Sequence, residues 1–150
     1  RVHRRQRQMC IRDSSNKVAM SLSDLFCVER HKAQFLELVK NKLDIIFANE
    51  QEILSLIESD SFDEAVTFLK NLNKNIVITR GEKGAIAINK GEIEECAAEK
   101  NLNIADLTGA GDLFAAGYLH GIINNLTTKE SLIKGTELSS KIIQKIGARI

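Results

Sequence analysis

A short run of small residues is the part of this sequence best suited to chemistry. Residues 106–112 have the sequence DLTGAGD, and the apolar stretch 113–123 follows directly. Small residues just before a helix leave its first N–H groups uncovered, and the helix dipole adds partial positive charge there. The pattern predicts that residues 109–111 hold an anion such as a phosphate, and that Asp112 accepts a proton from an attacking hydroxyl. The alternative is a tight turn in which Asp112 merely offers a favourable charge to the helix end.

A second candidate segment follows a predicted buried strand. Residues 43–48 form a continuous apolar run, typical of a strand covered on both faces in a parallel sheet. The next residues, 49–52, are Asn-Glu-Gln-Glu. Asn49 and Glu52 have the spacing of a capping box, in which each side chain satisfies the other's backbone N–H. Ligands of α/β sheets also bind at this end of the strands, and a cap and a ligand contact are compatible.

A third candidate segment follows the predicted strand 75–79. Thr79 is followed by Arg80, Gly81 and, three residues later, Gly84. Arg80 could make a fork-like contact to a phosphate group. A surface turn between two strands would explain the same residues.

The three segments together resemble the signatures of the PfkB, or ribokinase-like, carbohydrate and nucleoside kinases. DLTGAGD resembles the family's carboxy-terminal D-x-T-G-A-G-D, residues 49–52 its N-x-x-E motif, and residues 77–84 its V-T-x-G-x-x-G. The resemblance covers about residues 17–150 and keeps the family's motif order, which is more specific than any one motif. It implies catalytic roles for Asp112, Gly109, Ala110 and Gly111, nucleotide contacts from Asn49, Glu52, Thr79, Arg80, Gly81, Gly84 and Thr108, Mg²⁺ held through water by Glu52, and a monovalent cation such as K⁺ at Asp106.

Within the family, three stretches look most like the bacterial adenosine-kinase-like branch: residues 21–26, 44–50 and 146–149. This resemblance implies transfer of a phosphoryl group from ATP, with magnesium, to the 5′-hydroxyl of adenosine. A kinase for ribose, fructose or another sugar is the alternative within the family, and a non-catalytic nucleotide-binding module is the alternative outside catalysis. Thr136 and Ser140 are expected to be small polar helix residues rather than adenine contacts.

The elements that would position these residues alternate between apolar runs and amphipathic periods. This alternation predicts an α/β domain with a mostly parallel sheet, and the resemblance implies a ribokinase-like three-layer α/β/α fold with its amino-terminal half missing. The predicted strands are 17–21, 43–48, 75–79, 85–89 and 91–96, the last two forming an antiparallel hairpin at the edge. The predicted helices are 29–41, 50–58, 63–72, 111–124 and 129–146, the last capped by Thr127 or Thr128.

Composition indicates one globular domain, with 43% apolar and 27% charged residues. The apolar stretch 113–123 is too short to span a bilayer, so no membrane association is expected. Cys10, Cys27 and Cys96 are odd in number and widely spaced, which favours a reducing cytoplasm over a disulfide framework. A GxxxxGK[ST] motif and the HRD and DFG motifs are absent from the sequence, so neither a P-loop kinase nor a protein kinase is supported.

The amino terminus requires a separate interpretation. Residues 1–14 are strongly basic and resemble the translation of a transposon adapter used for sequencing libraries, so we expect them to be non-native. Without them, 16 basic and 19 acidic residues give a net charge of −3 in place of +1. The case for a nucleic-acid partner then disappears. Residues 15–150 are expected to be the carboxy-terminal, ATP-side portion of a kinase domain that takes a small-molecule nucleoside or sugar, and the oligomeric state stays open.

Overall fold

Five strands form one mixed sheet in the computed structural model, which describes residues 16–148. The order across the sheet is the order along the chain: β1 (Ala19–Ser21), β2 (Ile45–Asn49), β3 (Asn75–Thr79), β4 (Ala85–Asn89) and β5 (Glu92–Cys96). β1, β2 and β3 run parallel, whereas β3, β4 and β5 are successively antiparallel. The predicted edge hairpin is confirmed, and parallel pairing extends over the first three strands.

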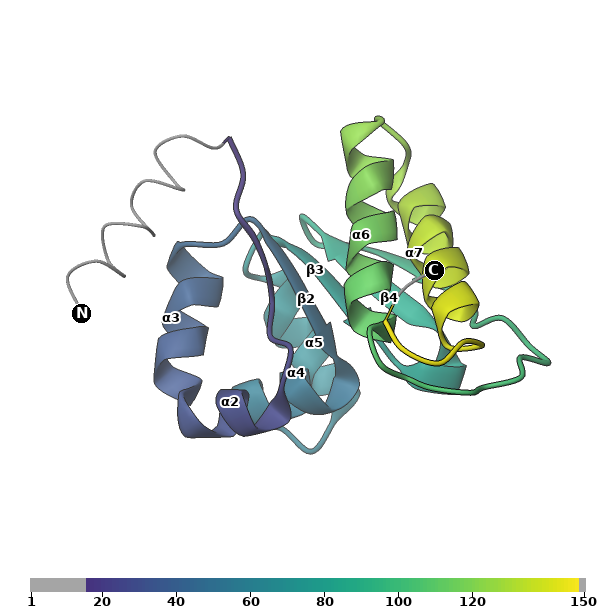
Figure 1. Ribbon diagram of the computed structural model, residues 1–150. Helices are drawn as coiled ribbons and strands as arrows, with labels where there is room; N and C mark the ends of the chain where they lie inside the picture. The colour runs from purple at the N-terminus through teal and green to yellow at the C-terminus, as the bar shows by residue number, and fades with distance from the viewer. Residues whose placement is uncertain (1–15, 149–150) are drawn as a thin grey trace.

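Helices cover both faces of this sheet, which confirms the predicted three layers. The helices are α2 (Leu25–Arg30), α3 (Lys32–Asn41), α4 (Glu50–Ile57), α5 (Phe62–Lys70), α6 (Ala110–Ile123) and α7 (Thr128–Ile142), with a 3₁₀ turn η1 (Gly81–Lys83) between β3 and β4. Figure 1 shows α6 and α7 together on one side of the sheet and α2 to α5 on the other. Each side has its own buried apolar cluster.

The central strands are apolar throughout because both of their faces are covered. In β2, Ile45 and Phe47 pack in the α6–α7 cluster, while Ile46 and Ala48 pack in the cluster on the opposite face. The strand alternates its side chains between two cores, so it lacks the apolar–polar alternation of a half-exposed strand. A register shift of one residue would exchange the two sets, which fixes β2 firmly against β3.

The predicted helix 29–41 was wrong in its start and its continuity. The helix begins earlier, at Leu25, because the Asp24 side chain accepts a hydrogen bond from the Phe26 N–H at 2.9 Å. It is then interrupted at His31, whose φ of −129° and ψ of 30° are not helical, and α3 begins after it. The continuous helical period of the sequence concealed this break.

Both carboxy-terminal helices also differ from their predicted bounds. α6 begins at Ala110, one residue before its predicted start, and α7 ends at Ile142 rather than at residue 146. Ile143 directly follows α7, and its carbonyl accepts hydrogen bonds from the N–H groups of Ala105 and Asp106 in the loop before α6. This carbonyl is therefore bonded to the loop and not to a further helical turn. Thr127 is the cap of α7, in a capping box with Glu130.

The predictions for the two ends of the chain cannot be compared with the structure. The proposed non-native segment 1–14 and the terminal Arg149 lie outside residues 16–148. Over that described range, no helix has both the length and the apolar character needed to span a bilayer.

Candidate active site

The predicted site segments meet in a cavity of about 420 Å³ at the carboxyl ends of β1, β2 and β3. Its lining includes Asn49 and Glu52 from the start of α4, Thr79 from the end of β3, and residues 109–112 from the start of α6. The carboxyl edge of the strands is where α/β sheets bind ligands, as the sequence suggested. Three segments far apart in the sequence are therefore neighbours at one site.

The start of α6 presents uncovered backbone donors to this cavity. Gly109 is the residue before the helix, with a φ of 80°, and its carbonyl accepts the Leu113 N–H at 2.9 Å. The Ala110 N–H donates to the Leu107 carbonyl at 3.2 Å. Within residues 16–148, no acceptor is found for the N–H groups of Gly111 and Asp112. The N–H of Asp112 is among the open donors because Asp112 lies in the first turn of α6, and sequence reasoning had assigned only the N–H groups of residues 109–111.

The two glycines of this loop are required for different reasons. Gly109 has a left-handed backbone, and a Cβ there would lie 3.0 Å from the Cβ of Ala148, so the fold itself requires glycine. Gly111 has neither constraint: a Cβ added to it would meet no atom within 4 Å in the described part of the chain. Space beside an uncovered N–H fits a ligand that approaches the backbone closely.

Asp112 lies at the third position of α6 and is exposed. Across the part of the chain that the structure describes, its carboxylate has no hydrogen-bond or ion-pair partner. The side chain lines the cavity beside the open N–H groups. A carboxylate in this position is available to accept a proton from a bound hydroxyl group.

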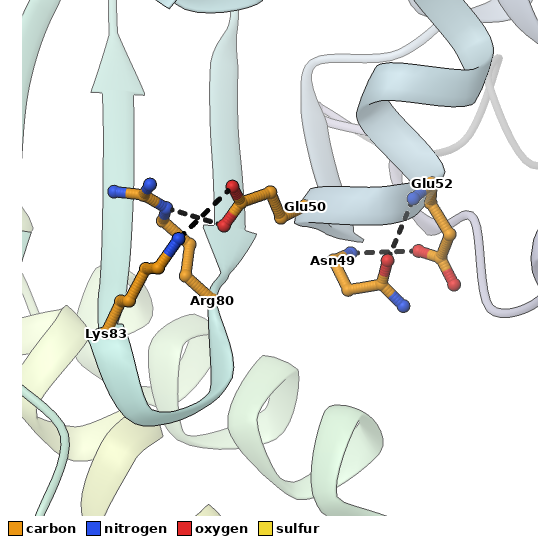
Figure 2. A network of polar contacts seen from close by, with 5 residues as sticks. All are labelled: Asn49, Glu50, Glu52, Arg80 and Lys83. Atoms are coloured by element: carbon orange, nitrogen blue, oxygen red, sulfur yellow. Dashed lines mark hydrogen bonds and ion pairs between the residues drawn. The ribbon is translucent and has the colours of Figure 1, made fainter. Parts of the chain in front are cut away.

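The Asn49–Glu52 segment forms the predicted capping box and also lines the cavity. The Asn49 Oδ1 accepts the Glu52 N–H at 2.8 Å, and the Glu52 Oε2 accepts the Asn49 N–H at 2.9 Å, as Figure 2 shows. Glu52 is only 5% exposed. Burial raises its pKa, the hydrogen bond from Asn49 opposes this shift, and the charge of Asp24 adds to it. A buried carboxylate with its second oxygen open to a cavity is suited to a hydrated cation.

The third segment is divided between the cavity and other contacts. Thr79 lines the cavity, whereas the Arg80 Nε donates to the Glu50 Oε2 at 2.9 Å and its guanidinium lies 3.9 Å from the centre of the Phe62 ring. Gly81 has a φ of 58° and opens η1. A Cβ on Gly84 would collide with the backbone carbonyl of Cys96, so this glycine allows β5 to approach the turn.

Asp106 and Thr108 organise the loop that leads into α6. The Asp106 Oδ1 accepts hydrogen bonds from the Thr108 N–H (2.9 Å) and hydroxyl (2.7 Å), and its Oδ2 accepts the Gly147 N–H at 2.9 Å. The bonds from Thr108 and then that from Gly147 lower the Asp106 pKa. The loop is thereby fastened to the segment after α7, a support that the short-range sequence pattern did not reveal.

Other predicted polar positions lie away from the cavity lining. Thr136 contacts the Cys96 sulfur at 3.7 Å, and Ser140 is buried at 5% exposure. Among residues 16–148, no three His, Cys, Asp or Glu side chains come together as a metal site. Ser21 and Ser23, which sequence analysis did not single out as site residues, also line the cavity.

Comparison with known proteins gives the same assignment as the motifs. The family model for pfkB family carbohydrate kinases matches residues 7–150. The chain is 32% identical to the cytidine kinase of Thermococcus kodakarensis over 119 residues, which is 77% of this chain and 42% of the relative. It is 30% identical to the ribokinase of Lactococcus lactis over 107 residues, covering 71% of this chain and 34% of the relative.

Solved structures agree in fold. The adenosine kinase of Sinorhizobium meliloti superposes with a TM-score of 0.91 at 35% identity, over 97% of this chain and 45% of that chain. A probable sugar kinase from Rhizobium etli superposes with a TM-score of 0.89 at 36% identity, over 95% of this chain and 43% of that chain. The chain thus spans less than half the length of these relatives. It belongs to the pfkB family of carbohydrate kinases.

Proposed function

We propose that this chain is the ATP-side portion of a kinase that transfers a phosphoryl group from ATP to the hydroxymethyl group of a nucleoside, with adenosine as the acceptor. The observation that carries the proposal is the single cavity that gathers Asp112, the open N–H groups of α6 and the Asn49–Glu52 segment. Base, anion hole and candidate magnesium ligand lie at one end of the sheet. Phosphoryl transfer depends mainly on such positioning and on stabilisation of charge.

Asp112 acts as the general base in this proposal. Its carboxylate takes the proton of the acceptor hydroxyl, whose oxygen forms a bond to the γ-phosphorus as the bond to the leaving ADP oxygen breaks. The proton ends on Asp112 and the electron pair of the broken bond ends on ADP. The open N–H groups of Gly111 and Asp112 hold the charged oxygens. The resemblance implies the same role for Gly109 and Ala110, of which the Ala110 N–H also donates to the Leu107 carbonyl. A single donor of this kind is typically worth about 10²- to 10³-fold in rate.

The residues present fit ATP with Mg²⁺. The open side of Gly111 leaves room for a phosphate oxygen, and the Glu52 carboxylate keeps one oxygen outside its capping bond. Mg²⁺ would supply neutralisation of phosphate charge, with Glu52 as its ligand through water and Asn49 and Thr79 nearby. K⁺ at Asp106 remains a smaller part of the proposal, because both oxygens of that carboxylate already accept hydrogen bonds.

Adenosine is proposed because the similar solved structures include the Sinorhizobium meliloti adenosine kinase at 35% identity. Cytidine kinase and ribokinase among the relatives keep a different nucleoside or a sugar as alternative acceptors. A non-catalytic nucleotide-binding module is the alternative of another class, and the retained Asp112 in an open cavity argues against it. Adenosine phosphorylation would place the protein in purine salvage in the cytoplasm, the compartment that the spaced cysteines favour.

The proposal is tested by measuring ADP release from the complete reading frame that contains this chain. Mg-ATP would be supplied with adenosine, other nucleosides, ribose and fructose in turn. Selective turnover of adenosine supports the full proposal. Turnover of a sugar alone would keep the phosphoryl-transfer mechanism and replace the acceptor, and ATP binding without turnover of any acceptor would favour the non-catalytic module.

The role of Asp112 is tested by its isosteric amide. Asp112→Asn should leave ATP binding nearly intact and lower turnover by at least about 10²-fold, the lower end of the usual contribution of a general base. Asp63→Asn is the matched control, because Asp63 also lies in the first turn of a helix, α5, and is exposed. Unchanged turnover in Asp112→Asn would remove Asp112 as the base.

A further inference from the structure

Arg80 belongs to a half-buried ionic network at the edge of the candidate site. Figure 2 shows the Glu50 carboxylate directed toward Arg80 and Lys83, and Glu52 directed to the other side of the start of α4. Glu50 lies 2.9 Å from the Arg80 Nε and 3.9 Å from the Lys83 Nζ. The Arg80 and Glu50 side chains are 22% and 23% exposed, and Phe62 covers the guanidinium.

The Arg80–Glu50 pair lies directly after the ends of two neighbouring strands, β2 and β3. Asn49 and Thr79 are partners in the β2–β3 ladder and are the last residues of their strands. Both line the cavity. Glu50 and Arg80 are the next residue in each chain segment, beyond the point where ladder hydrogen bonds hold the strands together. Their ion pair therefore continues the contact between the two strand ends past the end of the sheet.

A third element is joined at the same point. Phe62 is the first residue of α5, so the stacking of Arg80 on its ring links the β3 end to that helix as well. The hydrogen bond from Arg80 chiefly, with the charges of Arg80 and Lys83, holds the Glu50 pKa below its ordinary value against the effect of burial. Glu50 is thus anionic at neutral pH, where the pair is needed.

We propose that Arg80 and Glu50 are positioning residues that hold Asn49 and Thr79 in the arrangement that binds Mg-ATP, without touching the nucleotide themselves. The inference rests on the proposed function, because it assigns a role around the same site. It replaces direct phosphate binding by Arg80, the role that the sequence pattern suggested. The guanidinium is already paired with a carboxylate and stacked on a ring.

The two roles of Arg80 predict opposite results for Glu50. If Arg80 bound phosphate directly, Glu50→Gln would release the guanidinium and leave Mg-ATP affinity unchanged or improved. If the pair positions the site, Glu50→Gln and Arg80→Gln should weaken Mg-ATP binding by similar factors. The double variant should then be no weaker than either single variant, because both remove one interaction.

The experiment uses the complete reading frame and measures Mg-ATP binding by calorimetry alongside steady-state kinetics. Each single variant is expected to raise the Kd and KM for Mg-ATP about 5- to 20-fold, within the usual range for coupled neighbours, and to change kcat less than about twofold. Arg80→Lys should show a smaller loss, because an ammonium keeps the charge but not the planar stacking. It also supplies a conservative variant should Arg80→Gln fold poorly.

Glu58→Gln is the matched control. Glu58 lies at the other end of α4 and pairs with Lys32 at 3.0 Å, so its loss removes a more exposed ion pair of the same helix, away from the cavity. It should leave Mg-ATP affinity unchanged.

Three results would overturn the inference: weaker binding in Arg80→Gln alone, unchanged binding in both single variants, or additive losses in the double variant. Weakened and non-additive Mg-ATP binding in a protein that turns over no acceptor would support the inference while the proposed function fails. No Mg-ATP binding by the unaltered protein would overturn both.

Discussion

Alanine at Gly111 tests whether the start of α6 is shaped for a ligand or for the fold. A Cβ at Gly111 meets no atom within 4 Å among the described residues, so the chain itself accommodates alanine. Within a helix, alanine is more stable than glycine by about 0.5–1 kcal/mol, and the first turn should realise part of this difference. The melting temperature of Gly111→Ala should therefore be equal to or slightly above that of the unaltered protein.

Activity should respond in the opposite direction. The new methyl group would occupy the open side of an uncovered N–H, where we place a phosphate oxygen. Loss of one such donor contact typically costs about 10²- to 10³-fold in rate, so kcat/KM for Mg-ATP should fall by about 10²-fold. A more stable and less active variant is the expected combination.

Gly109→Ala provides the contrast within the same loop. Its φ of 80° is left-handed, which costs about 1–2 kcal/mol for a residue with a Cβ, and that Cβ would lie 3.0 Å from the Ala148 Cβ. This variant should lose both stability and activity. Thermal unfolding and initial rates on the same preparations make the comparison. A Gly111→Ala variant that is destabilised as much as Gly109→Ala, or that keeps full activity, would contradict a phosphate contact at the Gly111 N–H.

Three further substitutions test other parts of the structure. Glu52→Gln should raise the Mg²⁺ concentration needed for half-maximal rate with little loss of stability, because the amide oxygen can still accept the capping bond; an unchanged magnesium titration would contradict this role. Gly117→Ala should lower the melting temperature, since its Cβ would lie 2.6 Å from the Lys134 carbonyl oxygen and overpacking costs about 1–3 kcal/mol; an unchanged melting temperature would contradict this. Hydrogen bonds from the Thr127 N–H and then its hydroxyl lower the Glu130 pKa in the folded protein. Glu130→Gln should therefore be less stable than the unaltered protein by its full amount above the unfolded pKa of about 4.3, and the difference should disappear as the pH falls through the lowered pKa. Melting temperatures of both proteins from pH 7 to pH 3 would check this, and a constant difference would be inconsistent with it.

Local chemistry explains which elements were predictable. Strands 75–79 and 85–89 were predicted to the residue, because burial on both faces gives continuous apolar runs that polar turns bound sharply. The start of α2 was missed although its signal was present: Asp24 is a favoured capping residue, but the longer helical period that follows obscured it. The break at His31 has no comparable mark in the sequence.

The site was predictable where its contacts are short-range. The capping box joins residues three apart, and the open helix start of residues 109–112 depends on its own small side chains. The pairing of Arg80 with Glu50 could not be predicted from the sequence, because the direction of a side chain at a strand end depends on distant residues. Glu50 is thirty positions away in the chain, and its position follows from the packing of α4.

Asn49 is both the last residue of β2 and the cap of α4, so no loop separates the strand from the helix. Because the strand and the helix share this residue, a displacement of the end of β2 also displaces the start of α4, and the two elements move together. Any closing motion around a bound nucleotide would therefore have to bend elsewhere than at this joint. The side of the cavity that would hold magnesium is thus built without a loop between strand and helix.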